Sequence, residues 1–141
     1  MVIVETVETK KQMDEAFAVR YAVFVEEQNV PAEEEIDEFE EESVHFVAYE
    51  NNIPIGAGRM RKGTDFIKVE RICVLPPYRK TGAGRYIMKA IEALGQEQNF
   101  AEAKLHAQTR AVPFYEKLGY TITSDIFIDA GIPHVAMVKS L

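Results

Sequence analysis

The residues best suited to chemistry lie between Arg79 and Arg85. Two glycines there lack a Cβ and let a ligand approach the backbone, and the first N–H groups of a following helix have no partner within that helix. The helix dipole favours negative charge at the same place. This segment is therefore suited to binding a pyrophosphate. Its residues are Arg79, Lys80, Thr81, Gly82, Ala83, Gly84 and Arg85.

Other phosphate-binding loops do not match this segment. The P-loop pattern G-x-x-x-x-G-K-[ST] is absent, and the dinucleotide pattern G-x-G-x-x-G fails at its third glycine, both from Gly82 and from Gly56. A helix that merely begins with glycine is the alternative interpretation. The strand before the turn, with Val74 and Pro76 at its end, favours a ligand site.

The cysteine and two of the histidines lack the patterns that are typical of a nucleophile or a metal site. Cys73 is the only cysteine, so an internal disulfide is excluded. It lies within a predicted strand and has no histidine beside it in the sequence, so we expect a packing residue rather than a nucleophile. His45 and His106 have no partners at metal-ligand spacing, and we predict no metal site.

The elements that must position these residues follow from the hydrophobic pattern. A capping box at Thr9 begins a helix that we expect to reach about Val25, and Asn51-Asn52 suits a tight hairpin turn. The order of elements predicts an α/β (α+β) sandwich with a mixed, mostly antiparallel sheet of six to seven strands and helices on both faces. The predicted strands are 2–7, 44–50, 53–61, 66–75, 104–108, 120–128 and 134–139, and the later helices are 82–98 and 112–118.

Length and composition set the broad class. The chain has 141 residues, 47% of them hydrophobic, and no linker or repeat, so we expect residues 1–141 to form one domain. No apolar run approaches the roughly 18 residues that span a bilayer. The first residues do not resemble a signal peptide, and we expect a cytoplasmic protein without a membrane segment.

Charge is unevenly distributed. The net charge of −7 argues against general nucleic-acid binding. Residues 1–50 hold 15 acidic and 3 basic side chains, whereas residues 51–141 hold 8 acidic and 13 basic ones. This asymmetry suggests that one end of the protein meets cations and the other meets anions.

Two blocks of sequence resemble a known family. Arg79-x-x-Gly82-x-Gly84 after Val74-x-Pro76 resembles the acetyl-CoA signature of the GNAT N-acetyltransferase superfamily, and residues 111–120 resemble its A-x-x-F-Y-x-x-x-G-[FY] motif. Residues 20–28 with Ile36-Asp37, and residues 129–134, are similar to the small bacterial YjcF/ElaA-like branch. The resemblance covers nearly the whole chain.

The resemblance implies a fold with a splayed central strand pair, 66–75 and 104–108, that holds acetyl-CoA as co-substrate. The pantetheine arm would pair with the backbone of Ile72 and Val74, and the Val74 N–H would stabilise the oxyanion of the thioester. The loop 79–85 would hold the pyrophosphate. The implied cofactor-binding residues are the loop together with Ile72, Cys73, Val74 and Phe114.

The implied reaction is the direct attack of a primary amine, from a small metabolite or a peptide, on the thioester. Tyr115 matches the family's acid position, with a packing role as the alternative. For the base we favour Glu70, and His134 and a chain of water are the alternatives. Alternation puts Glu70 on one face with Ile72 and Val74, unless a bulge near Cys73 changes this.

Two further questions follow from the resemblance. A CoA-binding sensor with little or no turnover is the alternative function, and a homodimer is possible. Residues 33–42 include eight acidic side chains, which form either an acidic rim that attracts a cationic amine or an ordinary solvated face. We favour the solvated face.

Overall fold

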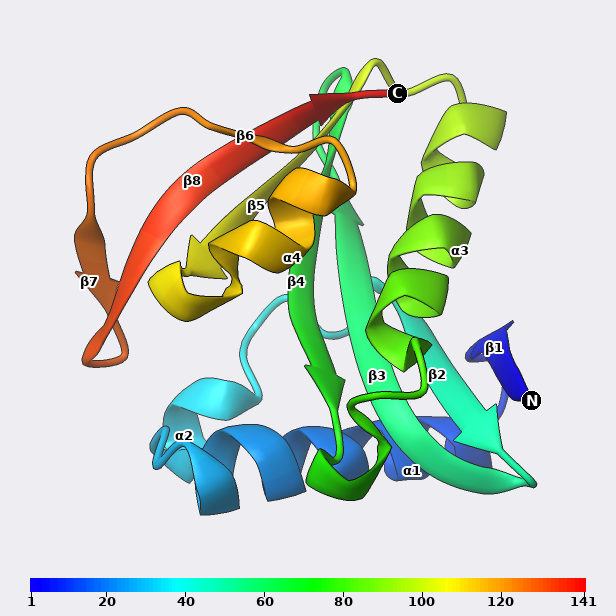
Figure 1. The fold of residues 1–141 in the computed structure, drawn as a ribbon. Coiled ribbons are helices and arrows are strands. Elements are labelled where there is room, and N and C mark those ends of the chain that lie inside the picture. Colours follow the sequence, from blue (N-terminus) through cyan, green and yellow to red (C-terminus); the bar gives the residue numbers. More distant parts are fainter.

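The computed structural model describes residues 1–141 and places eight strands in one sheet (Figure 1). The strand order is β1-β2-β3-β4-β5-β8-β6, β7 pairs with β8, and only the pair β4–β5 is parallel. The bounds are β1 Val2–Thr6, β2 Val44–Glu50, β3 Ile53–Lys62, β4 Phe66–Val74, β5 Glu102–Gln108, β6 Thr121–Ile122, β7 Phe127–Asp129 and β8 Ile132–Ser140.

The sheet has one more strand than predicted. The segment expected as one strand over 120–128 forms two short strands, β6 and β7. Between them, the Ser124 hydroxyl accepts the Ala136 N–H of β8, so a side chain takes the place of a ladder carbonyl. The mixed, mostly antiparallel sheet is otherwise as expected.

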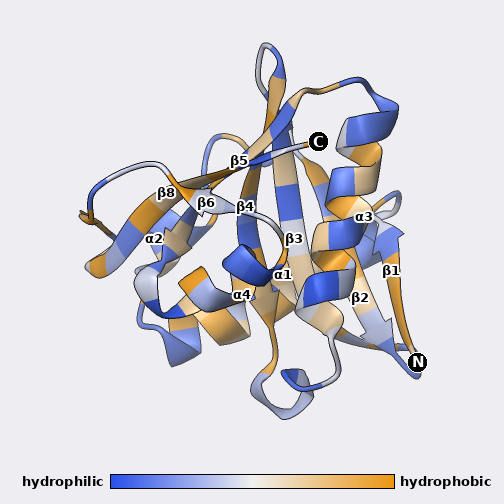
Figure 2. Cartoon of the chain, turned by 45° about the horizontal axis from the view of Figure 1, so that its top comes forward, coloured by the Kyte–Doolittle hydropathy of each residue, from blue (hydrophilic) through white to orange (hydrophobic).

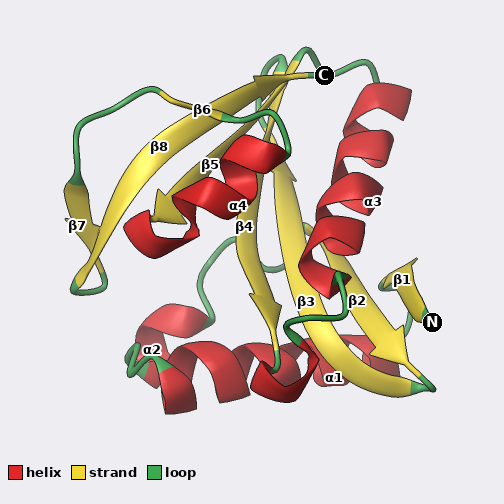
Figure 3. Cartoon of the chain, in the orientation of Figure 1, coloured by secondary structure: helices red, strands yellow, loops and turns green.

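Helices cover both faces of the sheet (Figure 3). Helices α3 and α4 contribute to the larger hydrophobic core, and α1 packs on the opposite face. The helical elements are α1 Lys10–Arg20, the π-helical segment η1 Tyr21–Glu27, α2 Ala32–Glu35, the 3₁₀ turns η2 Pro76–Tyr78 and η3 Thr109–Ala111, α3 Ala83–Glu97 and α4 Val112–Lys117.

Local sequence signals account for several of these boundaries. The capping box forms as predicted, with the Gln12 N–H donating to the Thr9 hydroxyl and the Gln12 amide oxygen accepting the Thr9 N–H. Asn51 and Asn52 both have positive φ in the β2–β3 turn. The first helix reaches Glu27, as expected within two residues, but its last turns are π-helical.

Helix α3 lies against strands β1 to β5, and its buried residues include Ile87, Met88 and Ile91. Its ribbon alternates between hydrophilic and hydrophobic colours, as expected for a helix with one face on the core (Figure 2). Close packing beneath it favours a glycine on β3, since a Cβ on Gly58 would lie 3.0 Å from the Ile87 Cγ2 atom of α3. No helix of the chain has the length and apolar character needed to cross a membrane.

Strands β4 and β5 part after a short paired stretch. Pairing joins Phe66–Val69 to Glu102–Leu105, and beyond these residues the two strands separate (Figure 1). The splayed central pair is therefore present. Backbone groups along the inner edges of this opening lack a strand partner, which a bound molecule can supply.

A β-bulge interrupts β4 at the opening. Arg71 has φ of +60°, and the β3–β4 register shifts between Ala57 and Arg59. The expectation from strict alternation is wrong here because the extra residue reverses the side-chain direction. Ile72 packs on the α3 core, whereas the Glu70 carboxylate meets arginines outside that core.

Candidate active site

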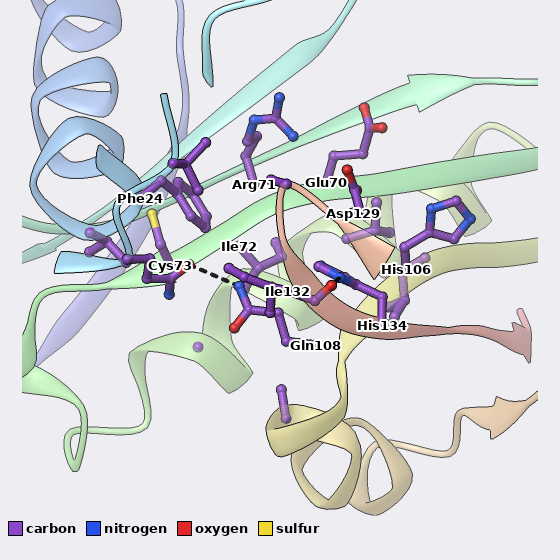
Figure 4. Close-up of a pocket in the computed structure, with 18 of the residues that line it drawn as sticks. Phe24, Glu70, Arg71, Ile72, Cys73, His106, Gln108, Asp129, Ile132 and His134 are labelled. Carbon is purple, nitrogen blue, oxygen red and sulfur yellow. Dashed lines mark hydrogen bonds between the residues drawn. The ribbon is translucent and has the colours of Figure 1, made fainter. Parts of the chain in front are cut away.

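A cleft of about 990 Å³ occupies the opening between β4 and β5. It is lined by both parted strands, by η1 and α2, by the start of α3, and by α4 and β8. Figure 4 shows its side chains, with Ile72 and Cys73 on β4 and Gln108 and His134 on the strands across the cleft. The cleft thus brings together segments from the whole chain.

The loop before α3 offers unpaired backbone donors. Within residues 79–86, Arg79, Thr81, Ala83 and Tyr86 donate their backbone N–H groups to partners in the chain. No partner is found for the N–H groups of the other four residues, Lys80, Gly82, Gly84 and Arg85. Two of these belong to the first turn of a 15-residue helix, where the dipole also favours an anion.

Glycine is required at one position of this loop by its backbone. Gly82 caps α3 with φ of +85°, a left-handed conformation that a Cβ disfavours. At Gly84 the reason is packing as well as access, since a Cβ there would lie 3.2 Å from the Phe114 ring. The two glycines that define the motif therefore have different structural roles.

Only some residues of the loop 79–85 line the cleft. Arg79, Gly82, Gly84 and Arg85 line the cleft. Lys80, Thr81 and Ala83 do not: Ala83 is in the core, and the Thr81 hydroxyl donates to the Tyr78 carbonyl. The Arg79 guanidinium donates to Glu27 and to the Val74 carbonyl, so it links the loop to η1 and to the end of β4.

On β4, residues Ile72, Cys73 and Val74 all line the cleft. The Leu75 N–H donates to the Ile55 carbonyl of β3. Because successive N–H groups of a strand point to opposite edges, the Val74 N–H points away from β3 and toward the opening. The Val74 carbonyl, which receives the Arg79 side chain, points the same way.

Tyr115 and Phe114 of α4 meet at the cleft with their rings edge to face at 5.0 Å. Tyr115 is buried, and burial raises the pKa of its phenol, so the group is protonated at neutral pH. A protonated phenol at the edge of the cleft can donate a proton or a hydrogen bond to a bound molecule.

Cys73 also faces the cleft, but its thiol is not activated. Burial raises its pKa to about 12, so almost none of it is thiolate at neutral pH. The side chain packs with Val19, Val23 and Ala57 in the smaller core on the α1 face. These surroundings agree with the packing role expected from the sequence.

Glu70 lines the cleft as well, and two arginines hold its carboxylate. Arg59 and Arg61 approach its oxygens to 2.8 and 2.9 Å. Burial opposes ionisation of Glu70, but the hydrogen bonds and charges of these arginines outweigh it, and the pKa of the carboxyl is lowered. A carboxylate held in this way binds a proton weakly.

The acidic segment 33–42 is not simply a solvated face, and that expectation is wrong for three of its residues. The carboxylates of Glu35, Asp37 and Glu40 face arginines from other elements, and Glu35 is 3% exposed. Their partners are Arg20, Arg59 and Arg71. We call these six residues together with Glu70 the arginine–carboxylate cluster.

The arginines of the cluster lower the pKa values of Glu40 and Asp37. Burial disfavours ionised Glu40, but hydrogen bonds and charge from Arg20 and Arg59 outweigh it and lower its pKa to about 2. Asp37 is similar: Arg59 and the Phe39 N–H overcome its desolvation, and its pKa falls to about 2. Both carboxylates are therefore ionised at neutral pH.

Several cleft residues were not predicted from the sequence. His106 lies 3.2 Å from the Lys68 ammonium, and burial together with that charge lowers its pKa. Gln108 donates to Gln28 of the segment after η1, and Asp129 lines the cleft from β7. The alternation of β5 puts His106 and Gln108 on one face, but only the pairing of β5 with β8 shows that this face is the cleft.

His134, an alternative base in the sequence analysis, does lie in the cleft. Its side chain is buried, and its Nδ1 is 2.7 Å from the Ile132 carbonyl oxygen. The Phe127 ring stacks on it at 6.0 Å. No group of three or more His, Cys, Asp or Glu side chains is arranged to hold a metal ion.

Comparison with known proteins agrees with this geometry. The model of the acetyltransferase (GNAT) domain family matches residues 7–141. The chain is 53% identical over 131 residues to YjcF of Bacillus subtilis (strain 168), an uncharacterized N-acetyltransferase, covering 92% of this chain and 94% of that protein. The resemblance to the YjcF/ElaA-like branch is thus supported from the sequence side.

Solved structures show the same fold. A Lactobacillus plantarum protein superposes with a TM-score of 0.92 at 29% identity, covering 99% of this chain and 98% of that one. Escherichia coli ElaA has a TM-score of 0.86 at 23% identity and 99% coverage of both chains. An acetyltransferase of Bacillus subtilis solved in complex with CoA has a TM-score of 0.77 at 17% identity, covering 100% and 99%.

The family match spans nearly the whole chain, and the relative shares more than half of its residues with it. The glycine loop and residues 111–120 carried the sequence resemblance, and the parted strands are what that resemblance implied. The chain belongs to the GNAT acetyltransferase family.

Proposed function

We propose that the protein transfers the acetyl group of acetyl-CoA to a primary amine, on a small metabolite or a peptide, by direct attack with both substrates bound. The observation that carries the proposal is the Val74 N–H, which faces the cleft where β4 and β5 part. A backbone donor aimed into an opening between strands is suited to polarise a thioester carbonyl and to stabilise the oxyanion that forms on it.

The glycine loop supports acetyl-CoA as the co-substrate. Its unpaired N–H groups can receive a pyrophosphate, as at other helix N-termini, and the Arg85 side chain adds positive charge at the cleft. The CoA complex of the Bacillus subtilis fold neighbour supports the same ligand class. In this arrangement the pantetheine arm would run along Ile72 and Val74, past Cys73 and Phe114.

Tyr115 is the proposed acid. When the amine nitrogen forms its bond to the thioester carbon, the C–S bond breaks and the sulfur needs a proton. The buried phenol holds one at neutral pH and lines the cleft. The nitrogen gives up two protons in the reaction from an ammonium, one of which replaces the proton of Tyr115.

The candidates for the base are Glu70, His134 and water. Glu70 stays a candidate because it lines the cleft, although Arg59 and Arg61 weaken its hold on a proton. His134 lines the cleft without a charged partner. Because an alkylamine is mostly protonated at neutral pH, one of these groups or water must act.

We place this activity in the cytoplasm, where a protein with one free cysteine stays reduced. A homodimer remains a prediction of the family resemblance.

The direct test is a screen of primary amines with acetyl-CoA, detecting the released thiol and the acetylated product. We expect product to form at 10² to 10⁴ times the uncatalysed rate or more for at least one amine class, on the order of what positioned acid–base groups supply. Tight acetyl-CoA binding without product from any amine would favour a CoA-binding sensor instead.

Tyr115→Phe tests the acid. We expect kcat to fall about 100-fold while the acetyl-CoA Kd changes less than about two-fold, because the hydroxyl acts on the leaving sulfur. Tyr120→Phe is the matched control. It removes a second buried hydroxyl from the same aromatic group, one that donates to Glu92 and does not line the cleft. An equal loss of kcat and of acetyl-CoA affinity in Tyr115→Phe would exclude the acid role.

A further inference from the structure

His134 has a defined tautomer in this structure. A carbonyl oxygen only accepts hydrogen bonds, so the contact of 2.7 Å to the Ile132 carbonyl requires a hydrogen on Nδ1. In the neutral imidazole, Nε2 then carries a lone pair. The side chain is nine-tenths buried, lines the cleft, and has no hydrogen-bond partner at Nε2. The ring therefore lines the cleft with an Nε2 lone pair that is free to accept a hydrogen bond or a proton.

The sheet register places this atom at the reacting level. Val69 and Leu105 form the last β4–β5 pair, and three residues further along β5 Gln108 pairs with His134 of β8. Three residues further along β4 is Ile72 or, allowing for the extra residue of the bulge, Cys73. His134 therefore stands level with the residues that precede the Val74 N–H, whereas Glu70 is level with His106.

His134 also lies on the face of the sheet from which we expect the amine to enter. Leu105, Ala107, Val135 and Met137 point into the core beneath α3 and α4. Alternation along β5 and β8 then directs His106, Gln108 and His134 to the opposite face. Figure 4 shows this group of side chains across the cleft from Ile72 and Cys73. An amine that enters on this face meets His134 before it reaches the strand opening.

We propose that Nε2 of His134 is the base that takes the proton from the acceptor ammonium. The inference rests on the proposed function. The nitrogen gives one proton to Nε2 and uses the freed electron pair to bond to the thioester carbon. The C–S bond breaks, the sulfur takes the Tyr115 proton, and the remaining excess proton on nitrogen restores that phenol. His134 then releases its proton to solvent, so one proton is released in each turnover of an ammonium.

The other titratable groups that could act as the base on this face already have charged partners. Glu70 is held by Arg59 and Arg61, and the His106 Nε2 is held by Lys68. In His134, by contrast, Phe127 covers one ring face and the Ile132 carbonyl fixes its orientation. Titratable and charged groups that line the cleft on the neighbouring elements include Lys68, Glu70, His106, Arg110 and Asp129.

The test compares three variants at one amine, from the pH dependence of kcat/KM. His134→Asn keeps an amide donor for the Ile132 carbonyl but has no acceptor at the Nε2 position. We expect it to lose about 100-fold in kcat at neutral pH and to lose the rise in kcat/KM that deprotonation of the base produces. Glu70→Gln and His106→Asn are expected to keep that rise, whatever they do to KM.

Loss of the rise in Glu70→Gln together with its retention in His134→Asn would overturn the proposal in favour of the carboxylate. Retention in all three variants would overturn it in favour of water. In either case the acetyltransferase activity of the unchanged protein would stand, so the failure of the proposal is separable from failure of the proposed function.

A second measurement does not need turnover. Nitrogen chemical shifts of His134 in the protein with CoA are expected to show Nδ1 protonated and Nε2 unprotonated at neutral pH. The opposite tautomer would overturn the assignment even if no amine substrate were found. In His134→Ala, added imidazole is expected to raise the rate of the variant at least about ten-fold, because it can occupy the vacated space as a base. Failure of imidazole to do so, with the ring shown to bind, would count against a base at this position.

Discussion

The two sides of the cleft present different chemical groups. The loop 79–85 offers backbone N–H groups, and its side chains are half-buried or exposed apart from Ala83. The arginine–carboxylate cluster consists of side chains, and Arg20 and Arg59 in it are 1% and 0% exposed. One side is suited to bind an anion from outside, whereas the other neutralises its own charges.

The difference predicts how each side tolerates change. A backbone donor survives replacement of its side chain, so the loop depends mainly on the conformation that Gly82 allows. Each arginine of the cluster instead serves several carboxylates at once. Removing one takes a partner from two or three carboxylates at once and leaves the buried site with excess negative charge, and this costs far more than a surface pair contributes. Stability should therefore depend on the cluster and acetyl-CoA affinity on the loop.

Arg59→Leu should have the largest effect. It leaves Asp37, Glu40 and Glu70 without a shared partner in a buried site, and we expect a loss of about 3–5 kcal/mol of unfolding free energy. Urea denaturation measures it. Arg85→Leu, at an exposed position of the loop, is the control and should change stability by less than about 0.5 kcal/mol. Equal losses in the two variants would contradict the division between the two sides.

Acid should have the second-largest effect on stability, because it protonates carboxylates of the cluster. Asp37 and Glu40 have folded-state pKa values of about 2, below their unfolded values, so their stabilisation is complete above the unfolded pKa and is lost as the pH falls toward 2. The arginines stay charged throughout this range. We expect about 2 kcal/mol of unfolding free energy to be lost between pH 7 and pH 3 because of these two groups.

Denaturation at several pH values would show this slope, and the double variant Asp37→Asn with Glu40→Gln provides the comparison. The variant should be less stable at pH 7 and should show a flatter pH dependence below pH 5. A slope as steep as that of the unchanged protein would mean that other carboxylates are responsible.

The same contrast explains what the sequence could reveal. The loop was predictable because its signals are local: glycines, a proline stop and the start of an amphipathic helix stand next to each other. The capping box at Thr9 and the turn at Asn51-Asn52 were predictable for the same reason. In each case the conformation is determined within a few residues.

The cluster was not predictable, because its pairs join distant parts of the chain. Arg59 and Asp37 are 22 residues apart, and Arg71 and Glu35 are 36 apart. A run of acidic residues is usually solvated, and nothing local marks Glu35 for burial. The bulge at Arg71 is similar, since it depends on pairing with β3, and it reversed the expected face of Ile72. Long-range pairing decides such features.

Gly82→Ala should affect stability less than Arg59→Leu or acid does, but it should selectively weaken acetyl-CoA binding. Gly82 has φ of +85°, and a Cβ in this conformation costs about 1–2 kcal/mol. Part of this cost lowers stability, and part is relieved by a shift of the loop that misaligns its N–H groups. We expect the Kd for acetyl-CoA, measured by calorimetry, to rise about ten-fold.

Gly131→Ala separates the two parts of that cost. Gly131 has φ of +75° in the β7–β8 turn, and a Cβ there would meet nothing within 4 Å, so the backbone penalty is similar but the loop 79–85 is untouched. We expect a comparable loss of stability and a Kd for acetyl-CoA within about two-fold of the unchanged protein. If both variants weakened acetyl-CoA binding equally, the affinity would depend on general stability, and the loop amides would not be the site of the diphosphate.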